Sequence, residues 1–380
     1  MTYGETIILE DTQIELSEFS ATSREWHAII HTTGTRKPFA HQVSDLRHGL
    51  SGLLSLLPST AVAMFARCHV SDAANQSAVL RQGLLELLDC PLSIIQQPPL
   101  DGSKAALWIY FVDQGSAKTL HDGTYAVEHG SYTHLWHTDT GQANGDPYMQ
   151  TRTAMENYAR MLEDNGCSLA DNCLRTWLFV HDIDNNYPGV VRARNDVFGQ
   201  YGLTNDTHFI ASTGINGSVG RQGVLLSMDT YAVRGLADGQ VRYLFAASHM
   251  NRTSDYGVSF ERGTAIEYGD RVHALISGTA SIDNRGQIVY PGDIRKQTGR
   301  MWENISALLD EAGMDIDADT VSMNVYLRDT ADYATVRKLF DERFPNRPKN
   351  ILLAPVCRPG WLIEMECMAV KDHRSGFPVF

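Results

Sequence analysis

The sequence lacks several features that would each place it in a distinct class of protein. Its six cysteines are scattered, and none forms the Cys-x-x-Cys pair that a zinc knuckle or a thioredoxin-like site requires. No apolar run reaches the roughly 18 residues that span a membrane. Residues 1–10 show no basic stretch followed by an apolar one, the pattern of a secretory signal. We therefore expect a cytoplasmic protein with reduced cysteines and no membrane contact.

Basic residues are also in short supply. The 380 residues include 32 Lys and Arg against 45 Asp and Glu, which gives a formal net charge of −13 at pH 7. A chain this acidic has no general attraction for nucleic acid, so we expect no nucleic-acid partner. With 43% hydrophobic and 20% charged residues, the composition is otherwise that of an ordinary globular protein. If the protein binds an anion, a few local arginines must do so.

A duplicated pattern is the most informative feature that is present. Three pairs of segments match in order: residues 156–166 with 303–313, 178–182 with 325–329, and 225–233 with 362–370. A weaker copy lies near the front of the chain, where a strand-like run at 62–69 precedes a helical pattern at 77–88. Repeats of this kind indicate units of one fold joined in a single chain.

Each unit predicts strands and helices in a non-alternating order. In the last copy, 272–276 alternates as a strand does, and 297–312 has the spacing of an amphipathic helix. A strand at 321–327 and a helix at 332–343 follow. This order predicts an α+β fold, with helices on one face of a mixed sheet. Composition breaks divide the chain into three units: residues 1–117, the most degenerate, then 118–238 and 239–380.

Four motifs in the last unit carry a resemblance to a known family: I-S-G-T-A-S at 276–281, G-D-I at 292–294, W-E-N-I at 302–305 and L-I-E-M-E at 362–366. They resemble the YjgF/RidA family, also described as endoribonuclease L-PSP. Members of that family are trimers whose sites lie in clefts between neighbouring sheets. The resemblance implies repeated RidA-like (chorismate-mutase-like) units that form a covalent pseudo-trimer. The chain would then work as a monomer or as a homo-oligomer.

Further motifs point to one branch of that superfamily. They are Arg175-Thr176-Trp177, Thr213-Gly214-Ile215, Tyr256-Gly257, Phe260-Glu261-Arg262 and Cys357-Arg358, together with the small residue Gly278. Over about residues 150–370 they resemble the two-domain chorismatases, with the last two features similar to the 3-hydroxybenzoate-forming type. Three departures bear on the substrate. The Thr213-Gly214-Ile215 loop continues into Asn216-Gly217-Ser218-Val219-Gly220 and not into the expected glycine-rich run. Phe179 stands where chorismatases usually carry a Tyr, and residues 192–198 lack a clear match to their downstream arginine.

Glu364 is the candidate catalytic residue. It lies in a strand between apolar neighbours, where desolvation favours the protonated carboxyl and suits a general acid. The second unit has Ser227 at the matching position, so the fold itself needs no carboxylate there. Glu366 is matched by Asp229 and is expected to be structural.

The resemblance implies that the substrate is chorismate or a similar small dicarboxylate. Cleaving its enolpyruvyl ether needs one acid and two carboxylate clamps, a role that the guanidinium fork of Arg suits. Arg262 and Arg358 are the predicted clamps, and Arg175 is the third candidate. The other predicted substrate-binding residues are Cys357, Gly278, Tyr256 and Gln297. The hydrolase that we expect uses no metal and no cofactor.

Two other functions stay open on the sequence. A RidA-type deaminase of imines or enamines would use Glu364 to position water. The resemblance places the carboxylate-binding Arg of those deaminases at Lys349, with Arg347 two residues away. A non-catalytic protein that binds small anions would keep the fold and the pocket. Two converging arginines favour a dianion, whereas a single cation favours an imine derived from an amino acid.

Overall fold

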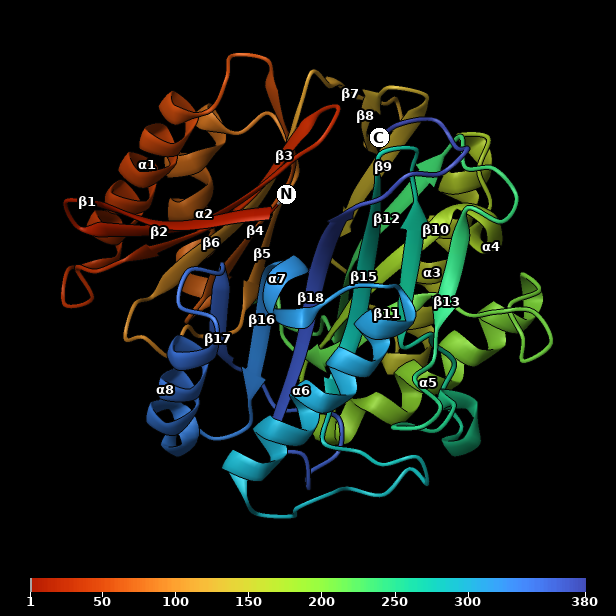
Figure 1. Cartoon of the computed structure of the whole chain (residues 1–380). Helices are drawn as coiled ribbons and strands as arrows, with labels where there is room; N and C mark the ends of the chain where they lie inside the picture. Colours follow the sequence, from red (N-terminus) through yellow and green to blue (C-terminus); the bar gives the residue numbers. More distant parts are fainter. Residues whose placement is uncertain (1) are drawn as a thin grey trace.

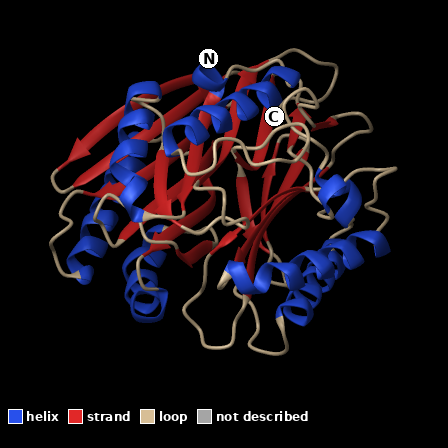
Figure 2. Ribbon diagram, turned by 90° about the horizontal axis from the view of Figure 1, so that it is seen from below, coloured by secondary structure: helices blue, strands red, loops and turns tan. Residues whose placement is uncertain are grey.

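The computed structural model describes residues 2–380, apart from the side chains of Thr2 and Tyr256. Within that range the chain forms three six-stranded sheets, which follow one another along the sequence (Figure 1). Figure 2 shows the sheets toward the middle of the molecule and the helices around them. The architecture is therefore α+β with mixed sheets, as the order of elements in the sequence predicts.

The elements group by sheet into three units. The first contains β1 (Thr2–Leu9), β2 (Thr12–Ser20), β3 (Arg24–Thr32), α1 (Phe39–Leu56), β4 (Ala61–Val70), α2 (Ala73–Leu84), η1 (Leu85–Leu87), β5 (Leu92–Gln96) and β6 (Ala105–Asp113). The second contains β7 (Ser116–Thr119), β8 (Tyr125–His129), β9 (Tyr132–Asp139), α3 (Pro147–Asp164), α4 (Leu169–Asn172), β10 (Cys173–Val180), α5 (Ile183–Gln200), β11 (Ala211–Asn216) and β12 (Leu226–Arg234). The third contains β13 (Val241–Leu244), η2 (Thr253–Tyr256), β14 (Gly263–Glu267), β15 (Arg271–Ala280), α6 (Ile294–Glu311), α7 (Ile316–Asp319), β16 (Thr320–Leu327), η3 (Thr330–Asp332), α8 (Tyr333–Arg343), β17 (Lys349–Leu353) and β18 (Ile363–Asp372).

All three sheets have the same strand order. They run β1-β2-β3-β6-β4-β5, β7-β8-β9-β12-β10-β11 and β13-β14-β15-β18-β16-β17. In each sheet the last pair is parallel, and the strands before it pair antiparallel. The predicted repeat is thus confirmed. It includes the first unit, whose resemblance to the others is one of pattern more than of identity.

In each unit, the loop that precedes the final strand in sequence (β6, β12 or β18) packs against an edge strand of a neighbouring unit. The backbone hydrogen bonds that mark these contacts are Gln96 N to Ser218 O (2.7 Å), Leu353 N to Pro98 O (2.8 Å) and Asn216 N to Pro355 O (3.2 Å). The second unit thereby lies on the first, the first on the third and the third on the second. The units close into a ring, so the chain is a covalent pseudo-trimer.

Buried ion pairs join the units near the centre of this ring. Arg67 of β4 pairs with Asp229 of β12 at 2.8 Å, and Arg175 of β10 pairs with Glu366 of β18 at 2.8 Å. All four side chains are at most 5% exposed. Because breaking such a buried pair leaves an uncompensated charge, the pairs favour this one arrangement of the units.

Candidate active site

A cavity of about 390 Å³ lies between the second and third units. The second unit contributes side chains of α5 and β11, and the third contributes β15, β18 and the loops before β14 and β18. Of the residues predicted from the sequence, this cavity is lined by Glu364, Arg262, Arg358, Cys357 and Gly278. The structure therefore brings together residues from distant parts of the third unit.

The interface between β11 and β15 holds the two walls together. Ser212 N donates a hydrogen bond to Ser277 Oγ (2.9 Å), and Gly278 N donates one to Thr213 Oγ1 (2.9 Å). A Cβ atom at Gly278 would overlap the carboxyl of Glu364. A residue without a side chain is therefore needed at position 278 if the acid is to keep its place.

Glu364 projects from β18, where it lies opposite Ala280 of β15 and Tyr326 of β16. It is only 5% exposed. Burial, together with the nearby charge of Glu366, raises the pKa of Glu364 to about 8, although Arg175 and Arg262 oppose the shift. At neutral pH the carboxyl therefore holds a proton that it can donate.

The predicted clamps each line the cavity and are oriented by their surroundings. Arg262 donates from Nη2 to the carbonyl of Asn251 (3.0 Å), and its guanidinium lies 5.7 Å from the ring of Phe260. Arg358 lies 4.8 Å over the ring of Trp361. Contacts with aromatic faces and backbone carbonyls restrict the orientation of a guanidinium group.

Arg194 is a cation of the same cavity that the sequence analysis did not single out. It lies on α5, is 1% exposed, and its Nε and Nη2 have no hydrogen-bond partner among the described residues. Its guanidinium lies 5.6 Å from the ring of Phe260, the same ring that Arg262 approaches. The two guanidinium groups therefore converge on one side of the cavity, in a buried setting that favours an anion.

The helical spacing of α5 could have identified Arg194. Tyr187, Val191 and Arg194 follow the i, i+4, i+7 spacing, and all three line the cavity. Arg192 lies at the mouth of the cavity and is exposed. Residues 192–198, which lack a clear match to the chorismatase motif, thus supply two arginines to this cavity.

Cys357 lines the cavity with a thiol that is protonated at neutral pH. Burial and the charge of Glu364 raise the pKa of its thiol to about 12, and Tyr187 is its hydrogen-bond partner. The thiolate needed for nucleophilic chemistry is therefore scarce at neutral pH. Tyr187 reaches this position because Gly214 has no side chain: a Cβ there would lie 2.9 Å from the Tyr187 ring.

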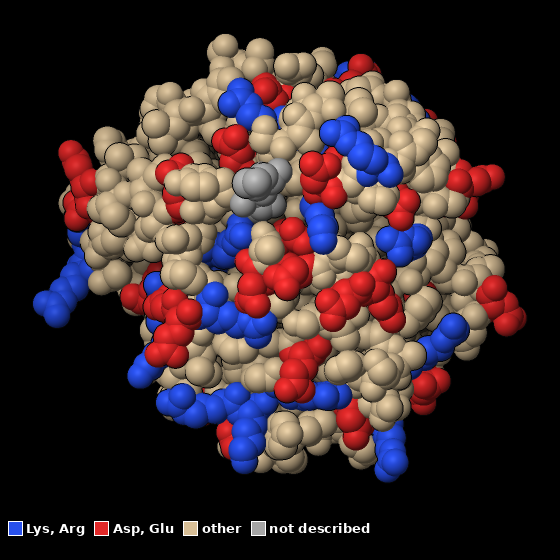
Figure 3. Space-filling view, in the orientation of Figure 1, with Lys and Arg blue, Asp and Glu red and all other residues tan. Residues whose placement is uncertain are grey.

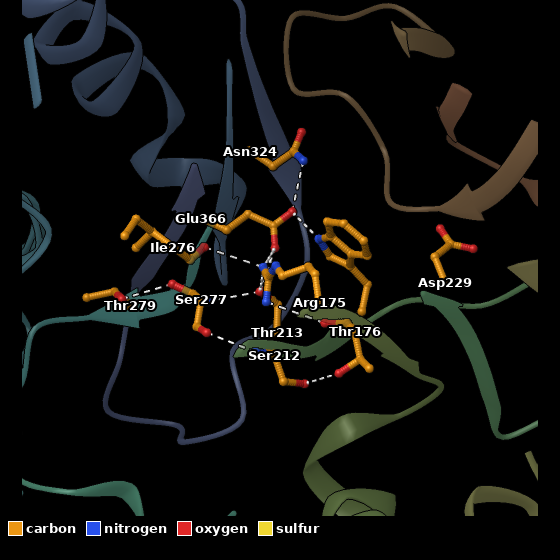
Figure 4. Close-up of polar contacts among 12 residues, drawn as sticks. Arg175, Thr176, Ser212, Thr213, Asp229, Ile276, Ser277, Thr279, Asn324 and Glu366 are labelled. Carbon is orange, nitrogen blue, oxygen red and sulfur yellow. Dashed lines mark hydrogen bonds and ion pairs between the residues drawn. The ribbon is translucent and has the colours of Figure 1, made fainter. Parts of the chain in front are cut away.

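Arg175 lies elsewhere. Its Nη2 donates to Glu366 Oε2 (2.8 Å) and to Thr213 Oγ1 (2.5 Å), and the residue is fully buried at the unit interface (Figure 4). Glu366 also accepts hydrogen bonds from Trp177, Asn324 and Tyr326, at 2.9–3.0 Å. The Arg-Thr-Trp motif therefore serves the buried carboxylate of Glu366, and Arg175 does not line the cavity.

Gln297 also lies outside the cavity lining. Its amide donates to the carbonyl of Gly360 (3.0 Å) and accepts from Leu362 N (2.9 Å), so it holds the loop that leads into β18. This contact makes Gln297 a support for the wall that carries Arg358. The side chain of Tyr256, another predicted substrate contact, lies outside the described residues.

Phe179 is remote from the cavity as well. It lies opposite Ser227 across β10 and β12, is fully buried, and has the guanidinium of Arg67 5.0 Å from its ring. The substitution of Tyr by Phe at this position therefore changes packing next to the second unit's cleft and leaves the cavity beside Glu364 intact.

The clefts of the other two units differ from this one. Strand register places Ala106 and Ser227 at the positions that match Glu364. Next to the first unit, Lys349 Nζ pairs with Glu15 Oε1 at 3.0 Å, both buried. Next to the second, Gly220 lies so close to the backbone of Ala74 that a Cβ would overlap it. The Glu364 cavity thus differs from its two counterparts in its acid and in the contacts around it.

We expect Arg175→Met to lower the free energy of unfolding by about 3–5 kcal/mol, because the buried Glu366 would lose its closer cationic partner and keep only Arg67, at 4.0 Å. Chemical denaturation of the variant and the wild type measures this difference. Arg160→Met, on an exposed turn of α3, serves as the control and should change stability by less than about 0.5 kcal/mol. Equal stability of Arg175→Met and the wild type would contradict a structural role for the pair.

The surface agrees with the acidic composition. On the face seen in Figure 3, Asp and Glu side chains are interspersed with Lys and Arg over all three units. Among residues 2–380, no helix is both long and apolar enough to cross a membrane. The arginines that line the Glu364 cavity thus form a local positive group in a protein whose net charge is −13.

The fold is that of a chorismatase. A chorismatase crystal structure superposes with a TM-score of 0.63 over 81% of this chain and 93% of that chain, at 19% sequence identity. Residues 263–371, in the third unit, match the family described as Endoribonuclease L-PSP.

Sequence relatives identify the family. A RutC family protein of Pyrococcus abyssi is 36% identical over 110 residues, which is 28% of this chain and 84% of that protein. The 3-aminoacrylate deaminase RutC of Acinetobacter baylyi is 31% identical over 96 residues, 25% of this chain and 75% of that protein. The chain belongs to this RutC family, within the YjgF/RidA superfamily that its motifs resemble.

Proposed function

We propose that this protein hydrolyses the enolpyruvyl ether of chorismate or of a similar cyclic dicarboxylate. The observation that carries the proposal is the position of Glu364, a buried, protonated carboxyl that lines a cavity together with three buried or half-buried arginines. The chorismatase fold and the motifs of the second and third units support it. Glu364 is the catalytic acid, and Arg194, Arg262 and Arg358 hold the carboxylates.

The reaction begins with proton transfer from Glu364 to the terminal methylene carbon of the enol ether. The π electrons form the new C–H bond, and the positive charge that results is shared between the ether carbon and its oxygen. Water adds to that carbon and gives a proton back to the Glu364 carboxylate. The hemiketal then breaks the bond between that carbon and the ring oxygen, and the proton of the hemiketal hydroxyl passes to the ring oxygen. This releases pyruvate and a dihydroxycyclohexadiene carboxylate, which yields 3-hydroxybenzoate if it loses water.

The arginines bind the two carboxylates of the substrate and exclude competing orientations. A guanidinium fork matches a carboxylate with two parallel hydrogen bonds. The guanidinium groups of Arg194 and Arg262 lie 5.6 and 5.7 Å from the Phe260 ring, and Arg358 lies on the loop before β18. Because these cations are fixed before the substrate arrives, the site loses little free energy to reorganisation during the reaction.

The cavity fits RidA-type imine hydrolysis less well. Lys349, the position that corresponds to the carboxylate-binding Arg of those deaminases, pairs with Glu15 next to the first unit. Arg347 donates to the backbone carbonyls of Asp317 and Ala318. Neither cation lines the Glu364 cavity, whose several arginines suit a dianion better than a monoanionic imine.

Product analysis tests the proposal. The purified protein would be incubated with chorismate without added metal or cofactor, and the mixture resolved by liquid chromatography with mass detection. Formation of pyruvate with 3-hydroxybenzoate or a dihydroxycyclohexadiene carboxylate is the expected result. Release of ammonia from 2-aminoacrylate or 3-aminoacrylate, without turnover of chorismate, would contradict the proposed chorismate hydrolysis and indicate imine hydrolysis instead. Chorismate binding without turnover, seen by calorimetry, would indicate a binding protein.

The pH dependence of kcat/KM should show a single limb on the basic side. The acid is active when protonated, so activity stays level well below the pKa of Glu364 and falls tenfold per pH unit above about pH 8. Initial rates in buffers from pH 5.5 to 10, at constant ionic strength, measure this profile. Activity that instead falls as the pH drops below about 8 would mean that Glu364 works as an ionised base.

A further inference from the structure

Arg328 connects the two walls of the Glu364 cavity. It follows β16 in the third unit, and its guanidinium forms a two-pronged contact with Asp184 of α5 in the second unit, at 3.0 Å from Nη1 and 2.6 Å from Nη2. The same Nη2 also donates to the carbonyl of Val356 at 2.7 Å. Val356 directly precedes Cys357 and Arg358, so one guanidinium touches both cavity walls.

The matching positions of the other two units lack this pair. Arg328 N donates to Leu362 O (3.1 Å), just as His181 N donates to Leu225 O and Ser71 N to Lys104 O. Arg328 is therefore replaced by His181 and Ser71 in the other units. By the same register, Asp184 corresponds to Ala74 and Ala331. The pair thus occurs at the cleft that contains Glu364 and not at the other two clefts.

The start of α5 needs such a contact. Pro188 lies inside the helix and has no N–H, so it cannot donate to the carbonyl of Asp184 four residues earlier. Asp182, which precedes the helix, has a left-handed backbone (φ 47°) and makes no side-chain cap. The first turn of α5 therefore has one helical hydrogen bond fewer to the turn that follows it. It leads directly into Tyr187, which lines the cavity and contacts Cys357.

We propose that Arg328 is a positioning residue, which fixes the spacing between the wall that carries Arg194 and the wall that carries Arg358 by binding Asp184 and the Val356 carbonyl together. Arg328 itself does not line the cavity. It acts through the clamps, because a carboxylate held from opposite sides requires the two walls at a fixed distance. The inference rests on the proposed function for its kinetic readout.

Arg328→Gln and Asp184→Asn test the inference with chorismate as substrate. For each we expect KM to rise about fivefold while kcat changes less than about twofold, because looser walls must be ordered when the substrate binds. The double variant should be no worse than either single variant, since both remove the same contact. Arg343→Gln is the matched control: Arg343 makes a similar exposed two-pronged pair with Asp317, at 2.7 and 3.0 Å, away from the cavity.

Hydrogen–deuterium exchange provides a readout without substrate. Exchange in residues 183–191 and 355–361 should be faster in Arg328→Gln and Asp184→Asn than in the wild type, and unchanged in Arg343→Gln. Unchanged exchange in these segments, or a kcat and a Tm that fall together at constant KM, would overturn the inference. If the wild type fails to turn over chorismate, the proposed function fails, and exchange alone then decides whether Arg328 joins the walls.

Discussion

Replacing Glu364 by Gln is expected to lower kcat by about 10²–10⁴-fold, the range that a positioned general acid contributes. Gln keeps the size of the side chain but cannot donate a proton to carbon. Because burial keeps Glu364 protonated near neutral pH, the change removes no charge there, and the variant should fold as the wild type does. Steady-state rates with chorismate at pH 6.5, with a thermal unfolding curve for each protein, give both quantities.

Glu303→Gln provides the comparison, because Glu303 is an exposed carboxylate on α6 that pairs with Arg300. Its activity and its Tm should equal those of the wild type. If Glu364→Gln keeps the wild-type Tm and more than about a tenth of the wild-type kcat, Glu364 is not the general acid. A variant that loses both activity and folding would not distinguish a catalytic from a structural role of Glu364. The Tm is therefore measured first, and Glu364→Met replaces Glu364→Gln if the latter does not fold.

Replacing Arg194 by Met should have effects of opposite sign on binding and on stability. We expect kcat/KM to fall about 10²-fold, chiefly through KM, because the substrate carboxylate loses a buried charged partner. Stability should rise by about 1 kcal/mol, because Nε and Nη2 of Arg194 are buried without partners and an apolar side chain of similar length relieves that cost. Kinetics and chemical denaturation of the same preparation measure the two effects.

Arg175→Met is the natural comparison for this result. Both arginines are almost fully buried, but Arg175 has Glu366 as its partner and Arg194 lines a cavity. Arg175→Met should therefore lose stability where Arg194→Met gains it. If both variants are destabilised to the same extent, Arg194 is part of the packing of α5 and the assignment of a clamp is wrong.

Several parts of the third unit could be predicted from local patterns. The helix expected at 297–312 is α6, Ile294–Glu311, and its apolar spacing buries Met301, Ile305 and Leu308. Asp293 accepts a hydrogen bond from Lys296 N and so fixes the start of this helix. Alternation in the last strand placed Glu364 between apolar neighbours. These features depend on residues a few positions apart, and such spacing is visible in a sequence.

The sequence was less informative about side chains whose partners lie in another unit or far away along the chain. Arg175 has a motif that resembles a substrate-binding one, but its partner Glu366 lies 191 positions away and belongs to another unit. Arg194 has no such motif, and only the packing of α5 against the third unit places it beside Arg262. Gln297 was expected at the substrate, whereas its amide is used by the backbone of Gly360 and Leu362.

The sequence by itself determined the fold of the units, their repetition and the strand position that carries Glu364, because periodicity and duplication are properties of the order of residues. The tertiary structure decided which arginines face the Glu364 cavity and which contacts join its walls. Those outcomes depend on how α5 and β11 of one unit pack against β15 and β18 of the next. Burial and charge act between side chains that meet only after the ring of units has closed, so no local pattern records them.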